Sequence, residues 1–141
     1  MNASYGSVEL SAAGRLLKAR FRIGNRTGHD WKAADGFRIG TQIVEAETHV
    51  YVEDGPRVVP GEVVVRGGSA EVEVGVELPE PSGRYRIYVS PMLEDAGWYY
   101  QQGWPFLAVD VAVEGGAARP VGWRVITARG LRTAILLRSL G

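Results

Sequence analysis

The sequence has no cysteine among its 141 residues. A disulfide scaffold, a thiolate metal site and a cysteine nucleophile are therefore excluded. Histidine is scarce as well: His29 and His49 are the two in the chain, so imidazole chemistry is nearly excluded. No apolar run approaches the roughly 18 residues of a membrane span, and the N-terminal residues lack the basic-then-apolar order of a signal peptide. We expect a soluble, cytoplasmic protein with no transmembrane segment.

An excess of charge of either sign is also missing. Lys+Arg and Asp+Glu number 16 each, and neutralising phosphates needs an excess of basic residues, so nucleic acid is excluded as a general partner. The charge is unevenly spread, because residues 1–114 contain all 16 acidic residues and residues 115–141 contain five arginines and no acid. We therefore predict two units, a β-sandwich domain over 1–114 and a linker with a basic amphipathic C-terminal segment over 115–141.

Strands are indicated by apolar residues that recur at every second position, and no helix-length amphipathic run separates them. In residues 71–78 the apolar side chains Val72, Val74, Val76 and Leu78 alternate with three glutamates and a glycine. The same period appears in 17–23, 37–43, 85–89 and 107–113, with shorter candidates at 5–10, 48–52 and 63–65. These segments predict about eight strands.

Turn signals lie between the predicted strands, including Asp35-Gly36, Asp54-Gly55-Pro56, Pro60-Gly61 and Gly67-Gly68. Short strands at this spacing without crossover helices are typical of an antiparallel sandwich. The expected fold is an all-β, antiparallel β-sandwich of about eight strands, immunoglobulin-like or jelly-roll, because both topologies give this pattern.

The last 27 residues have a different pattern. Residues 115–120 are predicted to be a linker, 122–127 a short strand, and 131–140 a short helix with an apolar side. Such a helix would dock on this domain, join a partner chain or lead into a following domain. The arginines beside it could also meet anionic lipid, although an interdomain connector is the preferred interpretation.

The central segment resembles a known family. The resemblance is carried by Phe21 to Gly28, Trp31, Phe37 to Gly40, Pro60-Gly61, Leu78 to Tyr85, and Met92 to Trp98. Together they are similar to immunoglobulin-like β-sandwich modules appended to bacterial polysaccharide glycosyltransferases and methyltransferases. A related module is the C-terminal carbohydrate-binding domain of O-antigen ABC transporter ATPases. The resemblance covers roughly residues 5–114, and the 45–54 and 98–104 segments are richer than the family pattern.

The resemblance implies an accessory module that acts beside an enzyme or transporter. No phosphate-binding G-x-x-x-x-G-K-[ST] motif and no glycosyltransferase domain is present in the sequence. The implied ligand is a glycan or polysaccharide, and the implied partner is a fused or separate glycosyltransferase or transporter.

The strongest candidate site is an aromatic loop. Sugar recognition uses flat apolar rings that stack on a pyranose and amides that bond its hydroxyls, and residues 98–104 contain both. The predicted ligand-binding residues are Trp98, Tyr99, Tyr100, Gln101, Gln102 and Trp104. The alternative is that Trp98 fills the core and Trp104 covers an edge, since adjacent residues of an extended segment face apart.

Three other sites are weaker. Glu45, Glu47, His49, Tyr51 and Glu53 would share one face of a strand and could bind a divalent metal, but such alternation is also typical of a solvated strand face. Asp30, Asp35 and Asp54 could hold calcium, although Asp-Gly is first a turn signal. Glu94 and Asp95 are adjacent and would face apart on a strand, so no catalytic pair is indicated.

We therefore expect a protein that is not an enzyme, with no catalytic residue, metal or cofactor. The predicted function is a non-catalytic carbohydrate-binding module associated with bacterial surface polysaccharide assembly or export. The alternative is a protein–protein interaction domain that forms a homodimer or docks an enzyme through its sheet edges or its tail.

Overall fold

The structure is a computed structural model and describes residues 2–126. All its long elements are antiparallel strands, joined by two short 3-10 helices, η1 (Ala33–Asp35) and η2 (Tyr99–Gln102), and no α-helix occurs within the described range. The strands are β1 (Ala3–Ala13), β2 (Leu16–Asn25), β3 (Trp31–Lys32), β4 (Phe37–Glu45), β5 (Tyr51–Val58), β6 (Val63–Val64), β7 (Ser69–Glu77), β8 (Gly83–Leu93), β9 (Gly97–Trp98), β10 (Phe106–Glu114) and β11 (Ala117–Ile126). The predicted all-β antiparallel class is confirmed.

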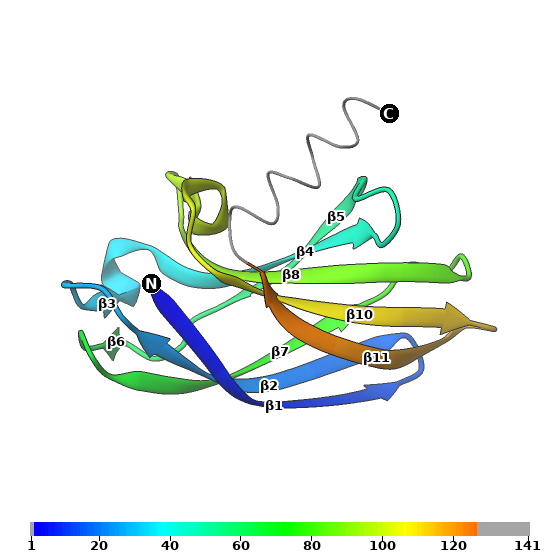
Figure 1. The fold of residues 1–141 in the computed structure, drawn as a ribbon, viewed down its shortest axis with the longest axis horizontal. Coiled ribbons are helices and arrows are strands. Elements are labelled where there is room, and N and C mark those ends of the chain that lie inside the picture. Colours follow the sequence, from blue (N-terminus) through cyan, green and yellow to red (C-terminus); the bar gives the residue numbers. More distant parts are fainter. Residues whose placement is uncertain (1, 127–141) are drawn as a thin grey trace.

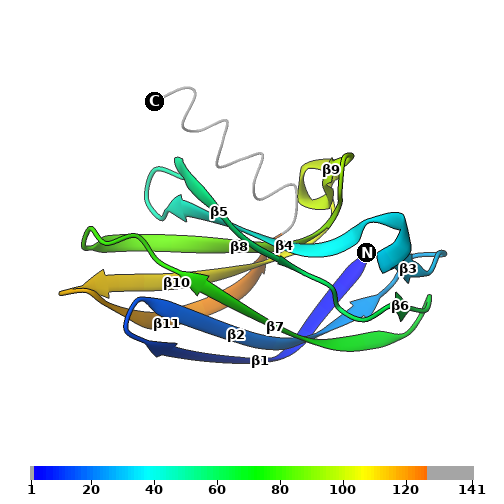
Figure 2. The ribbon, with the colours of Figure 1, turned by 180° about the vertical axis from the view of Figure 1, so that it is seen from behind.

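Two sheets face each other across a shared core (Figures 1 and 2). One sheet has the order β1-β2-β7. The other has six strands: five follow the order β11-β10-β8-β4-β5, which is called the five-stranded sheet below, and the two-residue β9 pairs with β8 beside them. Leu17, Phe21 and Val74 of the first sheet and Ile87 and Val109 of the second belong to one buried cluster. The small pair β3-β6 lies beside η1 at one end of the sandwich (Figure 1).

The period of two places side chains as the sequence predicts. Val72, Val74, Val76 and Leu78 are each at most 4% exposed, whereas Glu71, Glu73 and Glu77 are exposed. β7 pairs with β2 so that Val74 lies opposite Ala19 and Val72 opposite Phe21. The buried faces of both strands therefore coincide, which the opposite register would prevent.

A second buried cluster covers the other face of the five-stranded sheet. It consists of Val44, Tyr88, Met92, Trp98, Tyr100, Phe106 and Ala108, with Ile126 packed against it, and is called the outer cluster below. In β8, Ile87 and Val89 face the main core while Tyr88 faces the outer cluster. β10 and the Ile87–Met92 part of β8 are therefore buried on both faces, which explains why these stretches are mostly apolar.

The predicted strand over residues 48–52 is wrong in position. β4 continues to Glu45, residues 46–49 form the turn, and β5 runs from Tyr51 through the expected Asp54-Gly55-Pro56 turn. The Glu45 carboxylate accepts hydrogen bonds of 2.6 Å from both the amide and the hydroxyl of Thr48, and His49 has a φ of 59°. These hydrogen bonds stabilise the turn. The pairing of β4 with β5 changes register near Gly40 and near Ile43, and the first of these irregularities accommodates Gly55 within β5.

The predicted linker over residues 115–120 is also wrong. Gly115 and Gly116, with φ of 57° and 77°, form a two-residue turn, and Ala117 pairs with Glu114 to begin β11. Two successive positive φ values fit the tight hairpin turn that glycine favours. β11 contains the strand predicted over 122–127 as far as Ile126, so residues 117–126 belong to the same sheet as β10. The helix predicted over 131–140 lies outside the described residues.

None of the helices in the described range is both long enough and apolar enough to span a membrane.

Candidate functional site

The predicted aromatic loop is divided between the two faces of the five-stranded sheet. Trp98 and Tyr100 belong to the outer cluster, whereas Tyr99 and Trp104 are half-buried and pack against the main core. The six predicted residues therefore do not form one surface.

Trp98 and Tyr100 are buried and stabilise the outer cluster. Each is 9% exposed, and the Tyr100 ring contacts Tyr88 and Phe106 at centroid distances of 5.8 and 5.1 Å. The Tyr100 hydroxyl donates a 2.6 Å hydrogen bond to the Gln42 side-chain oxygen. Little of either ring is left for a ligand to stack on.

The two glutamines of the loop are exposed. Gln101 donates a long, 3.4 Å hydrogen bond to the Tyr100 hydroxyl, on the side of the outer cluster. Gln102 closes η2 before Gly103, whose φ of 101° ends the turn. Within the described range, neither side-chain amide forms a hydrogen bond with Tyr99 or Trp104.

Tyr99 and Trp104 form the centre of an aromatic group at one end of the sandwich. Their rings stack at 4.2 Å with an interplanar angle of 15°. Trp31 stacks on Phe37 at 4.7 Å and 14°, and its ring lies 6.0 Å from that of Trp104. Four rings from the β2–β4 connection and the η2 loop thus meet, and offset or tilted contacts of this kind are favourable.

A pocket of about 270 Å³ lies against these rings and is called the end pocket. This volume is slightly below the usual range for small-molecule sites, about 300–1,000 Å³. Its lining combines the aromatic group with charged and hydroxyl side chains from one loop: Thr27, His29, Asp30, Trp31, Lys32, Asp35, Phe37, Leu93, Tyr99 and Trp104. Flat rings beside carboxylates, an ammonium and a hydroxyl can both stack on a sugar ring and bond its hydroxyl groups.

The loop that carries the polar residues is held by Asn25, which is fully buried at the end of β2. Its side-chain NH₂ donates to the carbonyls of His29 and Val64 at 2.8 and 2.9 Å. Its side-chain oxygen accepts from the amide and hydroxyl of Thr27 at 3.0 and 2.6 Å. Asn25 is a positioning residue that the sequence analysis did not single out, although the Asn-x-Thr-Gly pattern contained the signal.

Trp31 is 5% exposed and contributes its ring to the aromatic group. Its indole N–H is buried and has no hydrogen-bond acceptor in the described part of the chain. An unpaired buried donor is rare in folded proteins. Trp31 lines the end pocket, but this nitrogen itself has almost no accessible surface.

The other candidate clusters are not brought together. Glu45 caps its own turn, and His49 Nδ1 lies 3.0 Å from the Tyr88 hydroxyl. Asp30 accepts a hydrogen bond from the Arg66 amide at 2.9 Å, which ties two loops together. Within residues 2–126, no group of three or more His, Asp and Glu side chains is placed to hold a metal ion.

Burial sets the electrostatics of the outer cluster. Desolvation raises the pKa of the Tyr88 and Tyr100 phenols above the ordinary tyrosine value. Both hydroxyls therefore remain neutral and serve as hydrogen-bonding groups. The end pocket differs, because its carboxylates, Asp30 and Asp35, are exposed.

Comparisons with known proteins assign no family to the chain. No protein-family model matches the sequence, and no curated protein matches it. Among solved structures, the chain is similar to part of β-glucosidase 3B from Thermotoga neapolitana, determined in complex with glucose, at 15% identity and a TM-score of 0.42. The match covers 89% of this chain and 16% of the β-glucosidase chain. What is established is an all-β, sandwich-like domain with a distant match to part of a β-glucosidase, and no family is assigned.

Proposed function

We propose that this domain is a non-catalytic carbohydrate-binding module that serves bacterial surface polysaccharide assembly or export, and that the end pocket is its sugar site. The observation that carries the proposal is the meeting of Trp31, Phe37, Tyr99 and Trp104 beside a polar loop at one end of the sandwich.

The chemistry of the end pocket suits a sugar ring. The half-buried rings of Tyr99 and Trp104 line the pocket and supply an apolar surface for the C–H side of a pyranose, while Asp35 and Lys32 supply an acceptor and donors for its hydroxyls. Neither Asp35 nor Lys32 has an ion-pair partner within residues 2–126. Both are therefore available for a ligand.

A binding role is favoured over catalysis. Glycoside hydrolysis uses one carboxylic acid whose pKa is raised by apolar surroundings or a like charge, opposite a second carboxylate. Asp30 and Asp35 are both exposed, and Asp30 is engaged with the Arg66 amide. Their surroundings are those of hydrogen-bonding groups on a loop.

The strand order supports the resemblance to immunoglobulin-like polysaccharide modules. The order β1-β2-β7 facing β5-β4-β8-β10 parallels strands A-B-E facing C′-C-F-G of an immunoglobulin sandwich. β11 then extends the second sheet beyond its usual edge. Ligand sites at the loops of one sandwich end are common in this architecture.

A glycan array probed with the purified full chain tests the proposal. We expect binding to a restricted set of glycans, with loss of binding in Trp104→Ala. Trp104 packs on the main core, so Trp104→Ala can also change the packing. Asp35→Asn is therefore tested as a second variant, because Asp35 is exposed in η1 and its replacement leaves the packing unchanged. Asp35→Asn is expected to weaken binding by about fivefold or more.

The matched control is Trp123→Ala, which removes the same indole from an exposed position on β11 outside the end pocket. It should bind as the wild type does. Absence of any glycan binding by the wild type, or equal losses in Trp104→Ala and Trp123→Ala with Asp35→Asn unaffected, would contradict the proposed site.

A second candidate function rests on a different observation. Val121, Trp123 and Val125 are 45%, 45% and 41% exposed on the edge strand β11. Trp123 and Val125 lie opposite Val109 and Leu107, so they are on the core side of the sheet but beyond the cover of the facing sheet. An apolar row on an unpaired edge can associate with the same strand of a second copy.

This homodimer is tested by analytical ultracentrifugation. We expect a dimer that Trp123→Glu converts to a monomer, whereas Val59→Glu, at an equally exposed position away from β11, leaves it intact. A wild-type monomer at high micromolar concentration would remove this candidate.

A further inference from the structure

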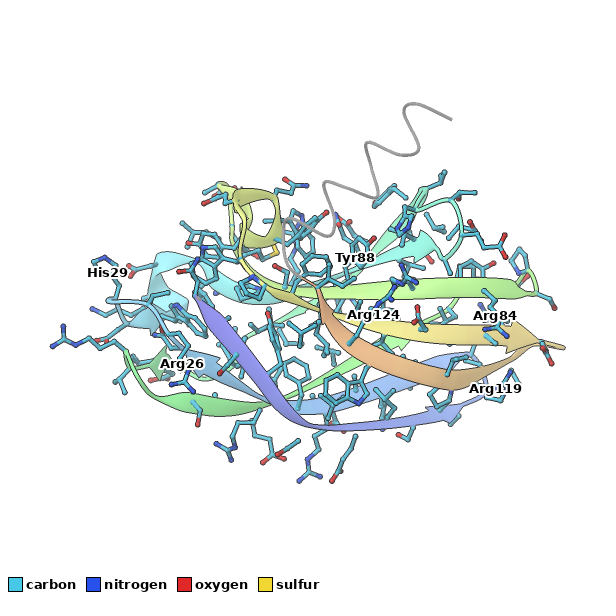
Figure 3. The ribbon with its side chains drawn as sticks, viewed as in Figure 1. Arg26, His29, Arg84, Tyr88, Arg119 and Arg124 are labelled. Atoms are coloured by element: carbon cyan, nitrogen blue, oxygen red, sulfur yellow. The ribbon has the colours of Figure 1, made fainter. Side chains whose placement is uncertain are left out.

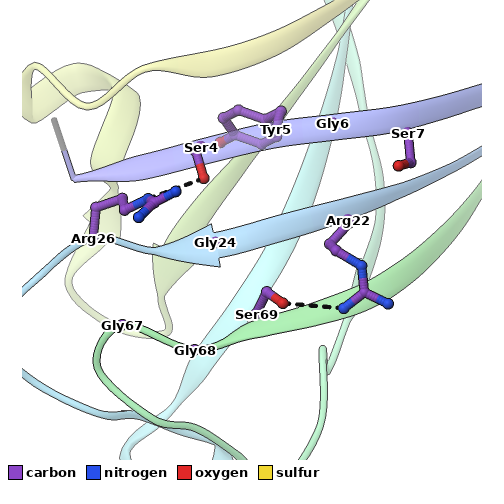
Figure 4. Close-up of a pocket in the computed structure, with 10 residues that line it drawn as sticks. All are labelled: Ser4, Tyr5, Gly6, Ser7, Arg22, Gly24, Arg26, Gly67, Gly68 and Ser69. Atoms are coloured by element: carbon purple, nitrogen blue, oxygen red, sulfur yellow. Dashed lines mark hydrogen bonds between the residues drawn. The ribbon is translucent and has the colours of Figure 1, made fainter.

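The outer face of the sheet β1-β2-β7 carries a groove of about 430 Å³ that none of the features above explains. It is lined by Ser4, Tyr5, Gly6, Ser7, Arg22, Gly24, Arg26, Gly67, Gly68 and Ser69 and is called the arginine groove below (Figure 4). Arg26 lies at the same end of the sandwich as His29, far from Arg84 and Arg119 (Figure 3).

The groove is hollow because glycines occupy its floor. Gly6 of β1 lies opposite Arg22, and Gly24 of β2 lies opposite Ser4 on one side and Ser69 on the other. A Cβ at Gly24 would collide with the Ser4 hydroxyl. The loop before β7 adds Gly67 and Gly68, so that backbone borders the groove there.

Two arginines supply the charge of the groove. Arg22 donates a 3.0 Å hydrogen bond to the Ser69 hydroxyl, and Arg26 donates a 3.3 Å bond to the Ser4 hydroxyl (Figure 4). Neither guanidinium has a carboxylate partner within residues 2–126, and no acidic residue lines the groove. Most of their N–H groups are therefore directed to solvent or to a ligand.

Arg20, a neighbour of Arg22 on β2, differs from the two groove arginines. Arg20 lies on the same face of β2 and is paired with Glu71. Glu71 is directly opposite Arg22 in the ladder, yet its carboxylate contacts Arg20. The acid that could neutralise Arg22 is thus held by its neighbour, and Arg22 is left with a neutral hydroxyl.

A bulge in β1 adds a further hydroxyl. The register advances by one extra residue between Gly6 and Glu9, and Ser7 takes a φ of 52° there. Ser7 is exposed and lines the groove instead of pointing into the sandwich. Bulges and non-glycine residues in the left-handed region cluster at functional sites, where they redirect side chains.

We infer that the arginine groove binds an oxyanion, either a phosphate, a sulfate or a carboxylate group of a small molecule or a sugar. Guanidinium groups match such anions in shape and charge, and serine hydroxyls complete their hydrogen bonding. The inference does not depend on the sugar site in the end pocket.

Amide NMR titrations of the full chain with sodium phosphate, sodium sulfate and sodium glucuronate, at constant ionic strength, test the inference. We expect saturable shifts at the amides of residues 4–7 and 67–69. Arg22→Gln and Arg26→Gln should each weaken binding by about tenfold or more. The anion that saturates the amide shifts at the lowest concentration shows whether the groove prefers a phosphate or sulfate group or the carboxylate of a sugar.

Two matched controls separate this site from general electrostatics. Lys18→Gln removes one positive charge from the same face of β2, outside the groove and without releasing Glu71 from Arg20, and should change affinity by less than about twofold. Gly6→Ala adds a methyl group where no atom lies within 4 Å, so it should reduce binding without unfolding the domain. Gly75→Ala is the control for Gly6→Ala, because its added methyl group lies outside the groove and would meet Leu16 at 3.6 Å.

Shifts that do not saturate with any of the three anions would overturn the inference, as would equal weakening in Lys18→Gln and Arg22→Gln. Asp35→Asn, an exposed substitution in the end pocket, should leave the phosphate titration unchanged, so failure of the sugar site and failure of the arginine groove are distinguishable.

Discussion

Neighbouring residues of the 98–104 segment have opposite surroundings, although their types are similar. Tyr100 is 9% exposed in the outer cluster, whereas Tyr99 is half-buried against Trp104 at the end of the sandwich. The sequence shows that aromatic residues gather here. Which side each ring takes depends on β4, β8 and β10, which are distant in the chain, so the local sequence could not predict it.

Replacing Trp98 should therefore test stability and not binding. Trp98→Ala removes a buried ring that packs on Tyr100 and is expected to lower the free energy of unfolding by about 3–5 kcal/mol. Gln102→Ala changes an exposed side chain of the same loop and should alter it by less than about 0.5 kcal/mol. Urea unfolding measures both, and equal effects would contradict the assignment of Trp98 to the outer cluster.

At the scale of elements, the β4–β5 hairpin departs most clearly from the sequence pattern. Alternating residues 45–53 predict one continuous strand face, but the Glu45 carboxylate binds Thr48 and turns the chain. These hydrogen bonds lower the pKa of Glu45, the Thr48 hydroxyl contributing most. Local side-chain bonding thus competes with strand formation.

The lowered pKa of Glu45 gives the hairpin an acid sensitivity. A carboxyl group whose pKa is lower in the folded state stabilises the protein above its unfolded pKa, and this contribution is lost as the pH falls through the folded value. The wild type should therefore lose more stability than Glu45→Gln between pH 6 and about pH 3. Urea unfolding at both pH values provides the measurement.

Glu47→Gln, which changes an exposed charge in the same turn, is the control for general charge effects. If it behaves as Glu45→Gln does, the acid sensitivity does not arise from the Thr48 hydrogen bonds.

The strands that sequence reasoning located best are those with one buried and one charged face, such as β2 and β7. β3 and β9 have two residues each, too few to show a period. The sequence predicts that the last strand begins at residue 122, whereas β11 begins at Ala117. A Gly-Gly pair such as Gly115-Gly116 occurs both in flexible linkers and in tight hairpin turns, so the local sequence does not separate the two. The pairing of β11 with β10 distinguishes them, and that contact is tertiary information.

At the scale of the whole molecule, the five-stranded sheet lies between two clusters of buried side chains. The main core lies on one face and the outer cluster on the other. β11 protects β10 along its whole length, from Phe106 opposite Ile126 to Glu114 opposite Ala117. The C-terminal strand is therefore part of the folded unit.

Truncation should show this directly. A chain that ends at Glu114 loses β11 and exposes the backbone edge of β10, so it should unfold at a clearly lower temperature and aggregate more than a chain that ends at Ile126. Thermal unfolding followed by circular dichroism compares the two. Equal midpoints would mean that β11 adds nothing to the sandwich.

The η2 loop has one further consequence. Tyr99 and Tyr100 are consecutive residues, yet one contacts the end pocket and the other donates a hydrogen bond to Gln42 on the outer face of the sheet. A single peptide unit therefore joins a ring of the end pocket to a residue of the outer cluster. The η2 loop fastens the end of the sandwich to the outer face of its larger sheet.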